Sequence, residues 1–347
     1  MIGGSVAKSY LFAILAMSTI AAVAGCVPKP ENALIVYSAA DREFAEPILD
    51  AFQRRHTKTE VISQFDIEST KTVGLVTRIE SESSRPRCDV FWNNEIMHTL
   101  RLESAGLLAP ISWDIPRDWP ASMRSQKGNW VGFGARARVL LVNREMLPAS
   151  GERPNSVLDL VDPRWQKKCG LASPLYGSTA THFTVLVDKL GAEKARAFFA
   201  EVKQNAVVLA GNKQVAQAVS AGQLAFGLTD TDDALIEIDN GLPVEIIFPD
   251  QKPDQLGTLM IPNTVAVLKN APHPVAAQSL ANFLLSEDTE GRLAMGSSGQ
   301  FPIRPNHPQK SRANPPFSPL RSMEVDFEKA AQLWPTVASQ LSDIFAK

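Results

Sequence analysis

Three loops of this 347-residue chain place polar side chains directly after apolar segments. Glu95 lies in the first loop, Ser178 and Thr179 in the second, and Asp232 in the third, which spans 229–233. Carboxylate oxygens can hold Ca²⁺ or Mg²⁺ or bind an amine, whereas hydroxyls and free N–H groups at a helix start can bind an anion. Each of these side chains could instead cap a helix. The loops are therefore candidate binding segments, with helix capping as the alternative.

The elements that carry these loops alternate between strand and helix. Strands are expected at 34–37, 60–65, 88–92, 137–142, 169–172, 206–209, 225–228, 244–248 and 264–268. Helices are expected after Ser38, from 93–95 onward and at 70–81, 180–190, 192–204, 214–221 and 274–285, with a short helical turn at 156–160. This alternation predicts parallel α/β layers, in which ligands bind beyond the carboxyl ends of strands.

The N-terminal segment 1–25 has the parts of a secretory signal peptide. It carries Lys8, an apolar run and small residues, and Cys26 follows directly. The junction resembles a bacterial lipoprotein signal, which implies a lipid on Cys26 and a polar tether at 26–33. A retained transmembrane anchor is the alternative, but the run is short for a hydrocarbon core of about 30 Å. We therefore expect a periplasmic or otherwise extracytoplasmic protein, with the lipid as its only membrane attachment.

Composition excludes several classes of function. A formal net charge of −2 provides no broad basic field, so nucleic acid is not an expected partner. Beyond Cys26 only Cys88 and Cys169 remain, which form no disulfide framework or zinc spacing, and both are expected to be free, buried thiols. The five histidines are dispersed, and the chain lacks a nucleophile elbow and a metalloprotease helix. We expect neither an enzyme nor a cofactor.

Six segments, in their order and spacing, resemble one known family. They are 36–38, 89–95, 105–110, 135–140, 156–160 and 272–285. They are similar to the periplasmic ferric-ion-type solute-binding proteins of ABC importers, which form family 1 of the type II class. The resemblance implies an α/β, two-lobed periplasmic-binding-protein type II fold. Each lobe would be a mixed sheet flanked by helices, with the ligand cleft at the hinge.

The resemblance also implies the division of the chain into lobes. Lobe one would comprise 34–135 plus 255–285, and lobe two 136–254 plus 286–347, with the C-terminal helices bracing lobe two. The chain would cross between them near 133–138 and 248–256. A monomer would close over its ligand and deliver it to the permease and ATPase subunits of an importer.

Ligand residues of the ferric-binding relatives map onto different residue types in this chain. Their histidine after the first strand becomes Asp41, their acid stays as Glu95, and their tyrosine pair becomes Thr231 and Asp232. None of the three tyrosines of this chain is expected there, so a phenolate site for Fe³⁺ is not predicted. If a metal binds, Asp41, Glu95 and Asp232 would be its ligands.

The family's anion loop corresponds to Ser178 and Thr179, which would form an anion cradle containing no arginine. The further ligand candidates are Ser38, Lys71, Asn212 and Thr229. An acidic set facing this cradle would suit a small anionic or zwitterionic solute with phosphonate-like chemistry. A ferric or other metal ion remains one alternative, and a ligand-sensing subunit that presents to a membrane receptor is another.

Overall fold

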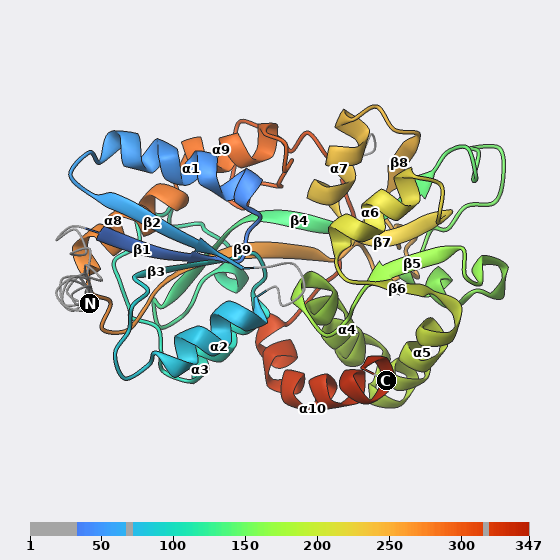
Figure 1. Ribbon diagram of the computed structural model, residues 1–347, viewed down its shortest axis with the longest axis horizontal. Coiled ribbons are helices and arrows are strands. Elements are labelled where there is room, and N and C mark those ends of the chain that lie inside the picture. The colour runs from blue at the N-terminus through green and yellow to red at the C-terminus, as the bar shows by residue number, and fades with distance from the viewer. Residues whose placement is uncertain (1–32, 67–71, 315–318, 347) are drawn as a thin grey trace, which may run out of the picture. The chain divides into compact units, whose positions relative to one another are not determined.

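The computed structural model describes residues 33–66, 72–314 and 319–346, within a compact unit that spans Asn32–Lys347 (Figure 1). The predicted signal peptide, Cys26 and Lys71 lie outside the described residues. No helix among the described residues is both long and apolar enough to cross a membrane.

The first group of strands surrounds β1 (Ala33–Ser38), which pairs in parallel with β2 (Glu60–Phe65) and β3 (Val90–Asn93). Successive side chains of a strand point to opposite faces, and β1 is buried on both. Ile35 packs in the core with α2 (Val73–Ser81) and α3 (Met97–Ser104). Leu34 packs with α1 (Arg42–Arg55) and α8 (Pro274–Leu284). Helices on both faces explain why this strand is apolar throughout.

The second group of strands surrounds β7 (Phe226–Asp230). It pairs in parallel with β5 (Cys169–Ala172), which pairs in turn with β6 (Val207–Leu209). The long helices α4 (Gly177–Leu190) and α5 (Ala192–Asn205) share one core, whereas α6 (Asn212–Ser220) and α7 (Thr231–Asp239) pack in another. The strand order through both groups is β2-β1-β3-β9-β4-β7-β5-β6, and β8 (Val244–Ile247) pairs with β4.

Strand β4 (Trp130–Asn143) connects the two groups (Figure 1). Its first part pairs with β9 (Met260–Val267), and from Arg138 onward it pairs with β7 or β8. The predicted strand was shorter because its pattern did not reveal the pairing with β9. A bulge lies at Gly134, whose φ of +43° and close approach of 2.6 Å between an ideal Cβ and Gln300 Oε1 favour glycine. These features confirm the mixed α/β, two-lobed architecture.

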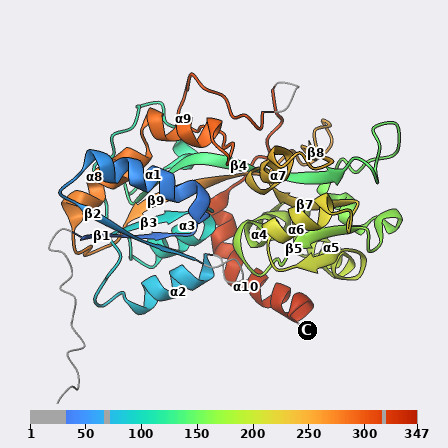
Figure 2. The same cartoon turned by 45° about the horizontal axis from the view of Figure 1, so that its top comes forward.

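The C-terminal helix α10 (Phe327–Phe345) contacts α3 as well as α4 and α5. Its Trp334 ring lies edge-on to His98 of α3, with 5.6 Å between ring centroids. The helix therefore packs against both lobes. Helix α9 (Glu287–Met295) contacts α1 and α8 and lies beside them in Figure 2. The predicted lobe boundaries stay a prediction. They assign α1 to lobe one and α9 to lobe two, although these two helices contact each other.

Candidate functional site

Two arginines of β4 dominate the interior at the junction of the strand groups. Arg136 and Arg138 are two residues apart, so their side chains leave the same face of the strand. Both are almost completely buried, with exposed fractions of 2% and 0%. Their partners include Asp230 at the end of β7. A buried charge is costly unless it is paired and hydrogen-bonded, so this cluster is a constrained feature of the fold.

Arg138 holds the starts of two helices and the end of one strand. Its Nη1 donates to Asp230 Oδ1 at 2.8 Å and to Ser178 Oγ and Asn212 Oδ1, each at 3.1 Å. Its Nη2 donates to Thr179 Oγ1 at 3.0 Å. Ser178 and Thr179 belong to the first turn of α4, and Asn212 is the first residue of α6. One guanidinium therefore ties together three segments that are distant in sequence.

Asp230 is the acidic centre of the same network. Its Oδ2 accepts hydrogen bonds from Ser178 Oγ at 2.6 Å, Asn212 Nδ2 at 2.9 Å and Arg136 Nη1 at 3.1 Å. Burial opposes its ionisation, but the charges of Arg136 and Arg138 outweigh that effect and lower the pKa of Asp230. The carboxylate is therefore ionised throughout the physiological pH range.

This network corrects the predicted anion cradle without an arginine. The Ser178 hydroxyl donates to Asp230 and accepts from Arg138 and Asn212, which uses its full hydrogen-bonding capacity. Asn212 uses both amide hydrogens and both oxygen lone pairs on these residues and Thr179. Sequence reasoning missed Arg138 because it examined strand ends. The informative feature was a pair of charges inside a strand that is otherwise buried and apolar.

A small pocket lies beside this network, at the starts of α4 and α6. Its lining includes Arg136, the predicted ligand residues Ser178, Thr179 and Asn212 and, from the other strand group, Asn94. The residues that precede the helices are Tyr176 and Gly211, and neither provides a side-chain cap. The first N–H groups of each helix have no intrahelical partner, and the helix dipole makes them attractive to anions. Two uncapped helix starts therefore border one pocket.

Arg136 adds a positive charge to the pocket wall and connects both lobes. Its Nη2 donates to the carbonyl oxygen of Asn94, just after β3, while its Nη1 lies 3.4 Å from Asp232 Oδ2. Burial disfavours the charged guanidinium, but Asp230 and Asp232, with smaller contributions from Asp41 and Asp233, raise its pKa. Its Nε has no hydrogen-bond partner among the described residues.

Glu95 has a structural role in this conformation. Its carboxylate accepts the backbone N–H groups of Met97 at 2.8 Å and His98 at 3.1 Å, and thereby caps α3. Its Oε2 also accepts a hydrogen bond from Thr181 Oγ1 of α4 at 2.8 Å. The helix-capping alternative is therefore realised, together with a contact between lobes. Its full set of partners leaves Glu95 poorly suited to bind a metal.

The other predicted site residues lie near the cluster in different roles. Thr229 Oγ1 donates to the carbonyl oxygen of Asn212 at 3.1 Å, and Thr231 Oγ1 accepts from the backbone N–H of Ala137 at 3.2 Å. Asp41 does not cap α1, although its charge acts on Arg136. Ser38 is buried, and its hydroxyl has no hydrogen-bond partner within the described ranges.

Three acidic side chains lie close enough to one another to hold a metal ion. One ligand atom from each of Asp230, Asp232 and Asp233 lies within 4.8 Å of the others. Arg136 already contacts Asp230 and Asp232, and Asp230 accepts four hydrogen bonds. A guanidinium therefore occupies the position in which a cation would balance this acidic group.

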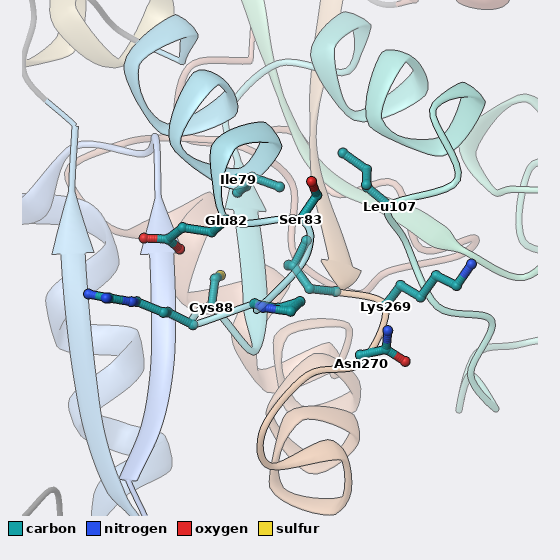
Figure 3. Close-up of a pocket in the computed structure, with 10 residues that line it drawn as sticks. Ile79, Glu82, Ser83, Cys88, Leu107, Lys269 and Asn270 are labelled. Atoms are coloured by element: carbon teal, nitrogen blue, oxygen red, sulfur yellow. The ribbon is translucent and has the colours of Figure 1, made fainter.

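The two predicted free thiols are confirmed, since Cys88 and Cys169 are buried and unpaired. Cys88 lies beside a second pocket, which is lined by Ile79, Glu82 and Leu107 among others (Figure 3). It precedes β3, at the opposite end of that strand from Glu95. Burial raises the pKa of the Cys88 thiol, which makes it a poor nucleophile.

The chain is similar to known bacterial binding proteins in sequence and in structure. A family model described as bacterial extracellular solute-binding protein matches residues 34–294. A "Fe(3+)-binding periplasmic protein" of Serratia marcescens is 23% identical over 92% of each chain. A "Putative 2-aminoethylphosphonate-binding periplasmic protein" of Salmonella typhimurium is 24% identical over 84% of each. The crystal structure of iron-bound HitA from Pseudomonas aeruginosa superposes with a TM-score of 0.79 at 24% identity, covering 89% of this chain and 99% of that chain.

Proposed function

Because the chain belongs to the bacterial extracellular solute-binding proteins, we propose that it captures a small anionic or zwitterionic solute for an ABC importer. The observation that supports an anion is the pocket bordered by the uncapped starts of α4 and α6 and by Arg136. Free backbone N–H groups and a guanidinium are typical donors to a phosphonate or phosphate group. Binding and delivery, rather than turnover, is the role of this family.

The charge around Arg136 supports a second, cationic end of the ligand. Four carboxylates, those of Asp230, Asp232, Asp41 and Asp233, act on its pKa. Carboxylates are the groups that bind an ammonium ion by charge-assisted hydrogen bonds, so an aminoalkylphosphonate would match the acids as well as the anion-binding helix starts. The Salmonella typhimurium relative is named for a ligand of this kind.

Ferric iron is the alternative, supported by the printed names of the Serratia marcescens relative and of HitA. Fe³⁺ prefers hard anionic oxygen ligands, and the acids Asp230, Asp232 and Asp233 are close enough to supply them. Arg136 argues against this alternative, because its guanidinium lies 3.1 Å from Asp230 and 3.4 Å from Asp232. A cation would have to displace it at a cost in buried charge.

The ligand can be identified by native mass spectrometry of the purified protein, followed by calorimetry with 2-aminoethylphosphonate, ethylphosphonate, phosphate, Ca²⁺ and chelated Fe³⁺. We expect the phosphonates to bind and the metals to bind weakly. Asp232→Asn should weaken 2-aminoethylphosphonate about tenfold more than ethylphosphonate, since a charge-assisted hydrogen bond contributes about 1.5–3 kcal/mol. Asp239→Asn, at the other end of α7, is the matched control. Tight Fe³⁺ binding without phosphonate binding would overturn the proposal.

A further inference from the structure

We propose that Arg138 is the positioning residue that sets the distance and angle between the two anion-binding helix starts. This inference rests on the proposed function, because it explains how the pocket between α4 and α6 is kept in shape. Arg138 is fully buried, so it need not touch the ligand to act. Its influence would pass through the residues that it holds.

The geometry of the guanidinium supports this role. Arg138 donates to Ser178 and Thr179 of α4 and to Asn212 of α6, at distances of 3.0–3.1 Å. A guanidinium is planar and projects its donors in a fixed fork, so the acceptors are held at fixed relative positions. A lysine would keep the charge but would replace the fork by one compact group. Arginine is therefore required for geometry as well as for neutralising Asp230.

Direct bonds between the helix starts complete the same unit. Asn212 Nδ2 donates to Ser178 Oγ at 2.9 Å, and Thr179 Oγ1 donates to Asn212 Oδ1 at 3.3 Å. These side chains are occupied with one another, which leaves the backbone N–H groups as the free donors of the two helix starts. Anion binding would then depend on how precisely the two backbones are aligned. Arg138 is the one described residue that donates to all three of these side chains.

Hydrogen exchange measured without ligand tests positioning independently of ligand identity. The first helical bonds run from the Ala180 N–H to the Tyr176 carbonyl and from the Val215 N–H to the Gly211 carbonyl, both at 3.2 Å. In Arg138→Lys we expect exchange at both amides to accelerate at least about fivefold. The control Thr229→Val removes only the bond to the Asn212 carbonyl of α6, so it should leave exchange at Ala180 of α4 unchanged.

Affinity provides the second readout. With a phosphonate that the wild-type protein binds, Arg138→Lys should weaken binding at least about tenfold, because several charge-assisted hydrogen bonds lose their geometry. If the lysine variant does not fold, Arg138→Met combined with Asp230→Asn removes one buried charge of each sign, which preserves stability better than removing Arg138 alone, and Arg136 keeps its contact with Asp232. That double variant should fold and still bind weakly.

The outcomes separate this inference from the proposed function. Unchanged exchange at Ala180 and Val215 in Arg138→Lys would overturn the positioning role, whatever the ligand is. Wild-type affinity in the folded double variant would also overturn it, because Arg138 would then only neutralise Asp230. Absence of phosphonate and phosphate binding to the wild-type protein would overturn the proposed function, while the exchange result would still decide the role of Arg138.

Discussion

Thr181 of α4 donates a hydrogen bond of 2.8 Å to Glu95, which lies directly after β3. Both residues are fully buried, and they belong to opposite sides of the strand β4 that joins the two groups of strands. The bond therefore links the two groups of strands, and Glu95 adjoins Asn94, which lines the pocket together with Arg136. Under the predicted capture by closure, such a contact would bias the equilibrium between open and closed forms.

Thr181→Val should favour the open form, because it keeps the side-chain shape and removes the hydroxyl donor to a buried carboxylate. We expect ligand affinity to fall about tenfold, as the loss of one hydrogen bond to a charged group predicts. Calorimetry measures the affinity, and small-angle scattering of the ligand-free protein should show a larger radius of gyration. Unchanged values of both quantities would contradict a role in closure.

Lys213→Gln tests an exposed contact between the same lobes. Lys213 Nζ lies 3.2 Å from Glu43 Oε1, and the two side chains are 46% and 48% exposed. Exposed ion pairs contribute only about 0.2–1 kcal/mol and are screened by salt. Affinity should therefore change less than about fivefold at physiological ionic strength, and more at low salt. A tenfold loss independent of salt would mean that Lys213 contacts the ligand.

His182 should make stability depend on pH. Burial, with a further contribution from Arg138, lowers its pKa to about 3, although Asp230 acts in the opposite direction. An unfolded histidine titrates near pH 6.5, so the unfolded chain binds more protons between pH 6.5 and 3. Stability should therefore be lost as the pH falls below about 6.5.

His182→Met should remove this contribution. Between pH 6.5 and 4.5 the wild-type free energy of unfolding should fall about 2 kcal/mol more than that of the variant. Urea denaturation at both pH values measures the difference. The buried His98 has a lowered pKa for the same reason of burial, so some pH dependence should persist in the variant. Identical slopes for the two proteins would refute the prediction.

Gly177→Ala should damage the pocket more than the fold. Gly177 begins α4 with a φ of +57°, a conformation that costs an alanine about 1–2 kcal/mol. Gly191, at the other end of α4, has a φ of +82° and no neighbour within 4 Å of an added Cβ. Both alanine variants should lower the melting temperature, but only Gly177→Ala should weaken anion binding. Equal affinities would show that the start of α4 is not part of the site.

Cys26→Ser tests the predicted lipid attachment. The sequence motif requires the thiol of Cys26 as the acceptor of the lipid, so the variant should lose membrane association and remain soluble or unprocessed. Fractionation of cells and labelling with a radioactive fatty acid measure both properties. Normal membrane retention of the serine variant would rule out the lipid tether.

The sequence alone determined the fold class and the segments that form the site. Apolar runs and helical spacing are local patterns, and they located the strands that end before Glu95, Ser178 and Asp232. The family resemblance, confirmed by the match over residues 34–294, fixed the two-lobed architecture. The absence of a tyrosine pair is also visible in the sequence, and it argues against a phenolate site for iron.

The tertiary structure decided which polar groups face the pocket. Arg138 and Asp230 are 92 residues apart, and Thr181 and Glu95 are 86 apart, so their pairing depends on the path of the chain. No local period encodes such contacts. Ser178, Asn212 and Glu95 bond to Arg138, Asp230 and Thr181 in this way, and their predicted roles as ligand residues stay a prediction. Arg136 and the two helix starts line the pocket, whereas the buried side chains of Ser178 and Asn212 hydrogen-bond to one another.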